Sequence, residues 1–109
     1  MKHINSFLLL IFLIQNLVGQ VENWERKASI MVDSQIMARG VSDNHVLNIM
    51  RQTPRHEFIP VEQQPNAYMD YPLPIGYEQT ISQPFIVAIM TELLDPKETD
   101  VILEIGTGS

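Results

Sequence analysis

The sequence predicts an α/β protein, and two stretches in its C-terminal half carry that prediction. Residues 101–109 begin as a short apolar run that passes through Glu104 to glycines at Gly106 and Gly108. A buried strand that opens into a tight glycine turn is the start of a nucleotide-type βα unit. Residues 71–90 are a proline-rich segment followed by apolar residues at helical spacing. A helix therefore precedes the predicted strand.

Two further helices are predicted in the N-terminal half. The first runs from Asn23, which can cap it, to Arg39, and Gly40 is expected to end it. The second begins at Ser42, with an acid in its first turn, and ends near Gln52. The N-terminal part of the molecule is therefore expected to be helical.

Shorter irregular elements connect these helices to the strand. A bend is predicted at Pro54–Pro60, with Phe58 anchored in the core, and a short helical turn at Val61–Asn66. A turn at Asp95-Pro96 precedes the strand. Trp24 and the methionines are expected to be core residues rather than a binding stripe, because methionine commonly fills irregular apolar gaps.

The segment Tyr71–Gly76 is predicted to be a stiff, irregular loop. Pro72 and Pro74 lack an amide donor and push the residues before them towards extended geometry. Gly76 permits a backbone turn that other residues resist.

A helix is predicted from Gln83 to Leu94, with a proline in its first turn. The preceding loop would bring Thr80 and Ser82 to the positive end of this helix. Free amides and the helix dipole favour a carboxylate at such a place. The alternative is that Ser82 only caps the helix.

Composition excludes several classes of function. The chain of 109 residues has 13 acidic and 7 basic residues and no basic run, which argues against a nucleic-acid partner. It has no cysteine, so thiol catalysis and disulfides are excluded within it. His3, His45 and His56 lack metal-ligand spacing, so no metal site is predicted.

Residues 1–19 are predicted to be a secretory signal peptide. Lys2 precedes the apolar run Phe7–Ile14, and Gly19 offers a small-residue cleavage site. The run is too short for a stable membrane span. Two alternatives are an uncleaved anchor and a translation start at Met31.

Several motifs resemble one family, protein-L-isoaspartate O-methyltransferase. They are residues 72–84 (Pro-Leu-Pro-Ile-Gly-Tyr-Glu-Gln-Thr-Ile-Ser-Gln-Pro), 103–109 (Leu-Glu-Ile-Gly-Thr-Gly-Ser), 54–60 and 67–70. The resemblance covers roughly residues 28–109. It implies a doubly wound, Rossmann-like methyltransferase fold with a helical N-terminal cap, of which residues 20–109 would be the N-terminal portion. Such a truncated chain is expected to be inactive by itself.

The resemblance implies a protein-repair enzyme. Family members transfer a methyl group from S-adenosyl-L-methionine to the α-carboxylate of L-isoaspartyl residues in damaged proteins. The methyl ester then collapses to a succinimide, which can reopen to aspartate. A monomer in the cytoplasm is implied, whereas the signal-like residues 1–19 indicate export. The sequence leaves that conflict open.

The resemblance also implies the site residues. Ser82 matches the active-site serine, with a role in hydrogen bonding rather than nucleophilic attack. The residues matching cofactor-contacting segments are Gln79, Thr80, Ile81, Ser82, Glu104, Gly106, Thr107 and Gly108. An alternative for Glu104 is a strand-end carboxylate satisfied by local amides.

Two other functions are compatible with the residues alone. A glycine turn after a strand also occurs in dinucleotide oxidoreductases, although that fingerprint usually opens the domain. The other is a non-catalytic exported binding module on the same fold.

Overall fold

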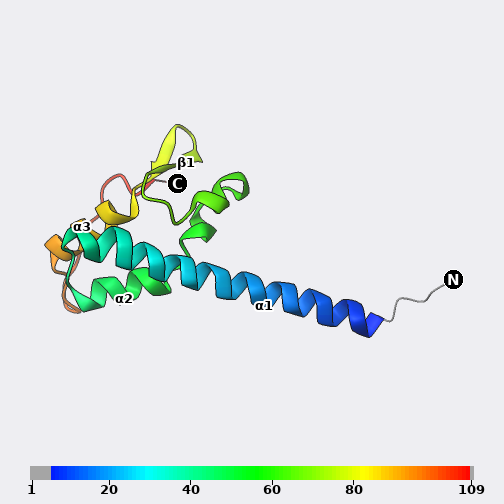
Figure 1. Cartoon of the computed structure of the whole chain (residues 1–109). Coiled ribbons are helices and arrows are strands. Elements are labelled where there is room, and N and C mark those ends of the chain that lie inside the picture. The colour runs from blue at the N-terminus through cyan, green and yellow to red at the C-terminus, as the bar shows by residue number, and fades with distance from the viewer. Residues whose placement is uncertain (1–5, 109) are drawn as a thin grey trace.

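The computed structural model describes residues 6–108, and only the backbone is described for residues 16–23. In chain order, the main elements are α1 (Ser6–Met31), α2 (Asn44–Gln52), β1 (Leu73–Gly76), β2 (Gln79–Ile81) and α3 (Pro84–Leu94). Short helical turns lie between them: a π-helical turn η1 (Val32–Ile36) and 3-10 turns η2 (Met37–Arg39), η3 (Arg55–Phe58) and η4 (Val61–Asn66). Helix α1 extends well beyond the remaining elements (Figure 1).

Helix α1 begins earlier than the sequence predicted. The expected start at Asn23 is wrong, because the helix continues without interruption from Ser6. The apolar run is rich in leucine, a strong helix former, and contains no proline to stop it. The residues at 7–14 are exposed. Lys2 and His3 lie outside the described residues, as do the side chains near Gly19.

No helix within residues 6–108 is both long enough and apolar enough to cross a membrane.

The expected helix end at Gly40 is confirmed. This glycine has a left-handed backbone, with φ of 98°, and its amide donates to the Met37 carbonyl at 3.0 Å. A residue without Cβ adopts that conformation at little steric expense.

Helix α2 starts two residues after the predicted Ser42. Its N-cap is Asp43, whose carboxylate accepts hydrogen bonds from the amides of His45 (2.8 Å) and Val46 (2.9 Å). Two amides of the first turn thereby gain an acceptor, which explains why the helix begins at this point. Its end at Gln52 is confirmed.

The predicted bend at 54–60 is a 3-10 turn, and the anchor within it was wrongly assigned. Phe58 is 64% exposed, whereas Ile59 is 4% exposed and belongs to the core. The chain leaves η3 in extended geometry at Ile59, with φ of −127° and ψ of 137°, so successive side chains point to opposite sides. The helical turn predicted at Val61–Asn66 is confirmed as η4.

The irregular loop predicted for Tyr71–Gly76 is wrong in its second half. Strand β1 pairs antiparallel with β2, with Leu73 opposite Ile81 and Pro74 opposite Thr80. Tyr77 and Glu78 form the turn with φ of 50° and 59°. A proline is tolerated here because each strand of a two-stranded sheet has an open edge, where an amide donor is not required.

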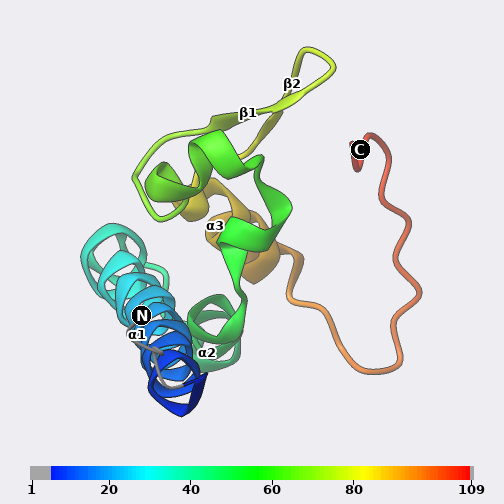
Figure 2. The ribbon, with the colours of Figure 1, turned by 90° about the vertical axis from the view of Figure 1, so that its right-hand side faces the viewer.

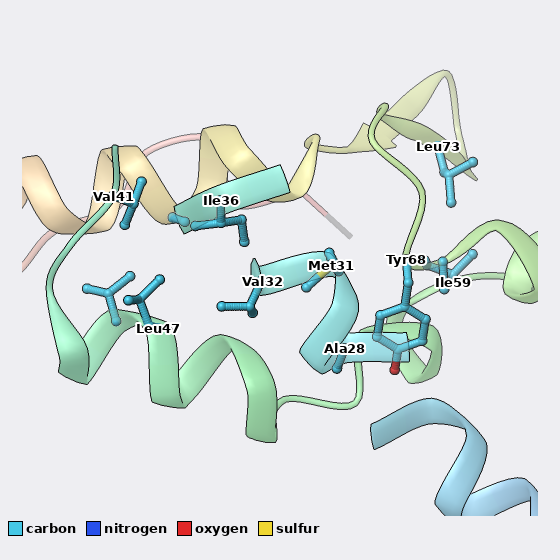
Figure 3. Close-up of a cluster of buried hydrophobic side chains, with 12 residues drawn as sticks. Ala28, Met31, Val32, Ile36, Val41, Leu47, Ile59, Tyr68 and Leu73 are labelled. Carbon is cyan, nitrogen blue, oxygen red and sulfur yellow. The ribbon is translucent and has the colours of Figure 1, made fainter. Parts of the chain in front are cut away.

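The helix predicted from Gln83 to Leu94 is confirmed as α3, with Pro84 in its first turn. The core lies where the end of α1 and η1 pack between α2 and α3 (Figure 3). Its buried apolar residues are Ala28, Met31, Val32, Ile36, Val41, Val46, Leu47, Ile59, Ala67, Tyr68, Leu73 and Ala88.

Trp24 and Met50 pack partly against this core, as predicted. The prediction is wrong for other methionines, because Met37, Met69 and Met90 are exposed.

Residues 101–105 do not form the predicted buried strand. Val101, Leu103 and Ile105 are almost fully exposed, and the segment has no regular secondary structure. Within residues 6–108 the sheet consists of β1 and β2 alone, so no parallel neighbour is present for this segment. The segment curves away from α3, and its end returns towards the hairpin (Figures 1 and 2).

Candidate functional site

A cavity of about 610 Å³ lies between the β2–α3 junction, η3 and the C-terminal glycine segment. The sequence-predicted residues Thr80, Ile81, Ser82, Glu104, Gly106 and Thr107 line it. The other lining residues are Glu57, Phe58, Ile59, Pro60, Ile75 and Val87. Two motifs separated by more than twenty residues therefore meet at one cavity.

Gln79 and Gly108, the other two predicted residues, lie against each other. A Cβ atom added to Gly108 would lie 3.3 Å from the side-chain oxygen Oε1 of Gln79. Gly106 and Gly108 both have left-handed backbones, with φ of 82° and 89°. Both glycines therefore have backbone conformations that favour glycine, but the chain has only a bend at Ile105, and neither the predicted tight turn nor the strand before it is formed within residues 101–108.

Ser82 is exposed and lies in the short link between β2 and α3. It is not the helix cap, because the N-cap position belongs to Gln83, which makes no side-chain capping hydrogen bond. The alternative that Ser82 only caps the helix is therefore wrong. Ser82 lines the cavity and directly precedes Gln83, the N-cap of α3.

The cavity is acidic as well as apolar. The carboxylates of Glu57 and Glu104 are the charged groups among its described lining residues. Such a lining favours a ligand that carries positive charge next to apolar surface. The threonine and serine hydroxyls on the β2 side add hydrogen-bonding groups.

A buried arginine supports the Ser82 side of the cavity. Arg55, in η3, is 7% exposed, and it donates from Nη2 to the Ser82 carbonyl at 2.6 Å. Burial lowers the pKa of Arg55. The sequence does not indicate this role, since a long-range bond to a backbone carbonyl leaves no pattern in it.

Gln83, the residue after Ser82, is held by a network of hydrogen bonds and an ion pair at the surface. The Nε2 of Gln83 donates to the Asp70 carboxylate at 2.8 Å and to the Asp70 carbonyl at 3.2 Å. Arg39 forms an ion pair with the same carboxylate, and its guanidinium lies 5.2 Å from the centre of the Phe85 ring. The hydrogen bond from Gln83, and then that from Arg39, lower the pKa of Asp70.

Comparison with known proteins places the chain among the methyltransferases. Residues 26–109 match the family described as protein-L-isoaspartate(D-aspartate) O-methyltransferase (PCMT). The chain belongs to this family, whose members are S-adenosylmethionine-dependent methyltransferases. The mixture of helices with a small sheet is consistent with part of such a fold.

Individual relatives agree with this assignment. The chain is 63% identical over 79 residues to protein-L-isoaspartate O-methyltransferase of Methanospirillum hungatei, covering 72% of this chain and 37% of that protein. It is 49% identical over 87 residues to the protein of that name from Petrotoga mobilis, covering 80% and 41%. It is 49% identical over 96 residues to protein-L-isoaspartate O-methyltransferase 2 of Nitrosococcus oceani, covering 88% and 38%.

The chain thus spans about two fifths of the length of these relatives. The comparisons lend no support to a dinucleotide oxidoreductase or to a non-catalytic binding module.

The cavity suits the methyl donor of this family. S-adenosylmethionine carries a sulfonium and an ammonium group, and the cavity offers two carboxylates together with apolar wall. The glycine segment leaves the backbone at Gly106 accessible, because nothing lies within 4 Å of the place a Cβ would take. The residues present therefore fit the donor.

Proposed function

We propose that this protein transfers a methyl group from S-adenosyl-L-methionine to the α-carboxylate of L-isoaspartyl residues in damaged proteins. The observation that carries the proposal is the shared cavity, in which the Thr80–Ser82 segment lies with Gly106 and Thr107. The names of the similar proteins support the choice of acceptor.

The donor, when bound, supplies a methyl carbon attached to a positively charged sulfur. We assign Gln79, Thr80 and Ile81, from β2, and Gly106, Thr107 and Gly108, from the glycine segment, to the surroundings of its methionine part. Glu104 would interact with the positively charged end. These roles use backbone amides, hydroxyls and one carboxylate, which are the groups that the cavity offers.

Ser82 is proposed to donate a hydrogen bond to the acceptor carboxylate. No strong general base is required, because a carboxylate is already ionised at neutral pH. The acceptor oxygen forms a bond to the methyl carbon as the carbon–sulfur bond breaks, and the bonding electrons stay on sulfur. The protein residues therefore act by orientation, which can supply several kcal/mol of the acceleration.

The finer features of the fold are also proposals. We propose that residues 101–105 belong to a parallel strand of a doubly wound sheet and that the N-terminal helices form a cap beside it. Four apolar side chains of this run are exposed, which supports a neighbour that covers them. A monomer is proposed, with residues 1–19 as an export signal and residues 20–109 within the methyltransferase domain.

The experiment that tests the proposed function is transfer of labelled methyl from S-adenosylmethionine by the complete gene product. The acceptors are an isoaspartyl peptide and its aspartyl isomer, which has the same composition. We expect base-labile label on the isoaspartyl peptide alone, because a methyl ester is hydrolysed by mild base. Absence of label, or equal labelling of both peptides, would overturn the proposal.

A further inference from the structure

The buried side chain of Arg55 joins two segments that are distant in the sequence. Its Nε donates to the Ala67 carbonyl at 2.7 Å, and its Nη2 donates to the Ser82 carbonyl at 2.6 Å. Ala67 follows η4, and Ser82 follows β2. A buried charge is unfavourable unless it is hydrogen-bonded, and these two short bonds provide that compensation.

The geometry of arginine suits this arrangement. The guanidinium is planar and rigid, so two carbonyls bound by it are held in a fixed relation to each other. A lysine in its place would have a single nitrogen on a flexible stem. Ser82 lies in the link between β2 and α3, which has no regular secondary structure.

The same link is held on its other side by the surface network. Gln83 is bound to Asp70, and Asp70 is bound in turn to Arg39, whose guanidinium lies over Phe85. The start of α3 is thus tied to η4 from the interior and to the end of η2 from the surface. Arg55 itself does not line the cavity, although its neighbours Glu57 and Phe58 do.

We propose that Arg55 is a positioning residue, which fixes the backbone of Ser82 and thereby sets where the serine hydroxyl meets the acceptor carboxylate. The inference rests on the proposed function. In-line transfer is sensitive to small displacements, and a misplacement of about 1 Å can lower a rate about a hundredfold. Arg55 acts through Ser82 and has no contact with the reacting atoms.

The test compares Arg55→Met, which keeps the stem and removes the donors, with Arg55→Lys, which keeps the charge. The control is Arg51→Met in α2, where the arginine forms a more exposed pair with Asp33 at 2.8 Å. Hydrogen–deuterium exchange is measured in the complete gene product, comparing residues 79–87 with α2. Turnover, KM for the isoaspartyl peptide and Kd for S-adenosylmethionine are measured on the same samples.

In Arg55→Met we expect exchange at residues 79–83 to rise about tenfold, because a hydrogen bond to a charged donor is lost. Turnover should fall by about tenfold to a hundredfold. The Kd for the donor should change little, and Arg55→Lys should recover part of the turnover. In Arg51→Met, exchange at residues 79–83 and turnover should match those of the unaltered protein.

Three outcomes would overturn the inference: unchanged exchange at residues 79–83, a rise in exchange that is uniform over α1 and α2, or unchanged turnover. If Arg55→Met does not fold, Arg55→Lys carries the same comparison. Failure of the proposed function is recognised separately, because the unaltered protein would then not methylate the peptide. The exchange data would still decide whether Arg55 holds the link.

Discussion

Ser82 and Arg55 show how a single position acquires its role from the residues around it. The serine is exposed at the cavity wall, and its own carbonyl is bound by a buried arginine. The side chain is therefore available to a ligand while the backbone is held. A serine that capped the helix would instead direct its hydroxyl to the amides of the first turn.

Replacement of Ser82 by alanine tests its role in the reaction. Turnover of the complete gene product on an isoaspartyl peptide should fall by about tenfold to a hundredfold, the effect of one hydrogen bond to a charged group. The Kd for S-adenosylmethionine should stay within about twofold, since Ser82 is assigned to the acceptor. Unchanged turnover would contradict the assignment. Ser42→Ala, at an exposed serine before α2, is the matched control.

At the residue scale, the resemblance named residues that line the cavity, but it did not indicate the arginine that holds the backbone of Ser82. Thr80, Ser82 and the glycines were named because residues 72–84 and 103–109 resemble motifs of the protein-L-isoaspartate O-methyltransferase family. Arg55 was not found, because its partners are carbonyls that lie 12 and 27 residues away. Phe58 was placed in the core because it is large and apolar, but the backbone geometry at Ile59 decides which of the two side chains is buried.

At the scale of elements, helix ends were predicted better than strands. Gly40 and the proline at the start of α3 act locally, so their effects can be read from the sequence. Strand β1 depends on pairing with β2. Pro74 within it and Pro72 before it suggested a loop, because a proline is tolerated in a strand only at an open edge, and that edge exists only once the pair has formed. Whether residues 101–105 form a strand likewise depends on a neighbouring strand with which they can pair.

The cap of α2 gives a prediction about pH. The hydrogen bond from the Val46 amide lowers the pKa of Asp43 below its ordinary value of 3.8. The lowered pKa stabilises the fold above that ordinary value, and the stabilisation is lost as the pH falls through the lower folded value. In Asp43→Asn the side-chain amide oxygen can still cap the helix, but it does not titrate. At pH 7 the variant should therefore unfold at a temperature a few degrees lower than the unaltered protein.

Thermal unfolding between about pH 7 and pH 2.5 measures this difference. It should shrink as the pH falls below about 4, because the Asp43 carboxyl of the unfolded chain binds a proton there, and it should be lost once the folded carboxylate is protonated as well. A difference that is constant over the whole range would contradict the prediction. Glu25→Gln removes a carboxylate from an exposed position of α1 and is the control.

At the scale of the whole molecule, α1 joins an exposed apolar segment to the core. Residues 7–14 are exposed, whereas Ala28 and Met31 are fully buried in the same helix. The family match begins at residue 26. A chain that started at Met31 would lack Ala28, which belongs to the core, and Trp24, which packs against it, whereas a chain that started at Gln20 would retain both.

The proposed export signal at residues 1–19 predicts that the mature protein begins at Gln20. Mass spectrometry of the intact protein and of its N-terminal peptide, from cells that express the gene, measures this directly. Leu10→Arg interrupts the apolar run and should leave the N-terminus unprocessed, because a signal peptide requires an uninterrupted apolar region. A mature N-terminus at Met31 would contradict both the export signal and the structural argument.

The central claim is that the β2–α3 link and the glycine segment together form the methyl-transfer site. A crystal structure of the complete gene product with bound S-adenosylhomocysteine and an isoaspartyl peptide tests it most directly. We expect the Ser82 hydroxyl within about 3 Å of the acceptor carboxylate, with the Gly106 backbone against the methionine part of the ligand. A Ser82 hydroxyl that points away, separated from the bound ligands by more than about 3.5 Å, would contradict the account.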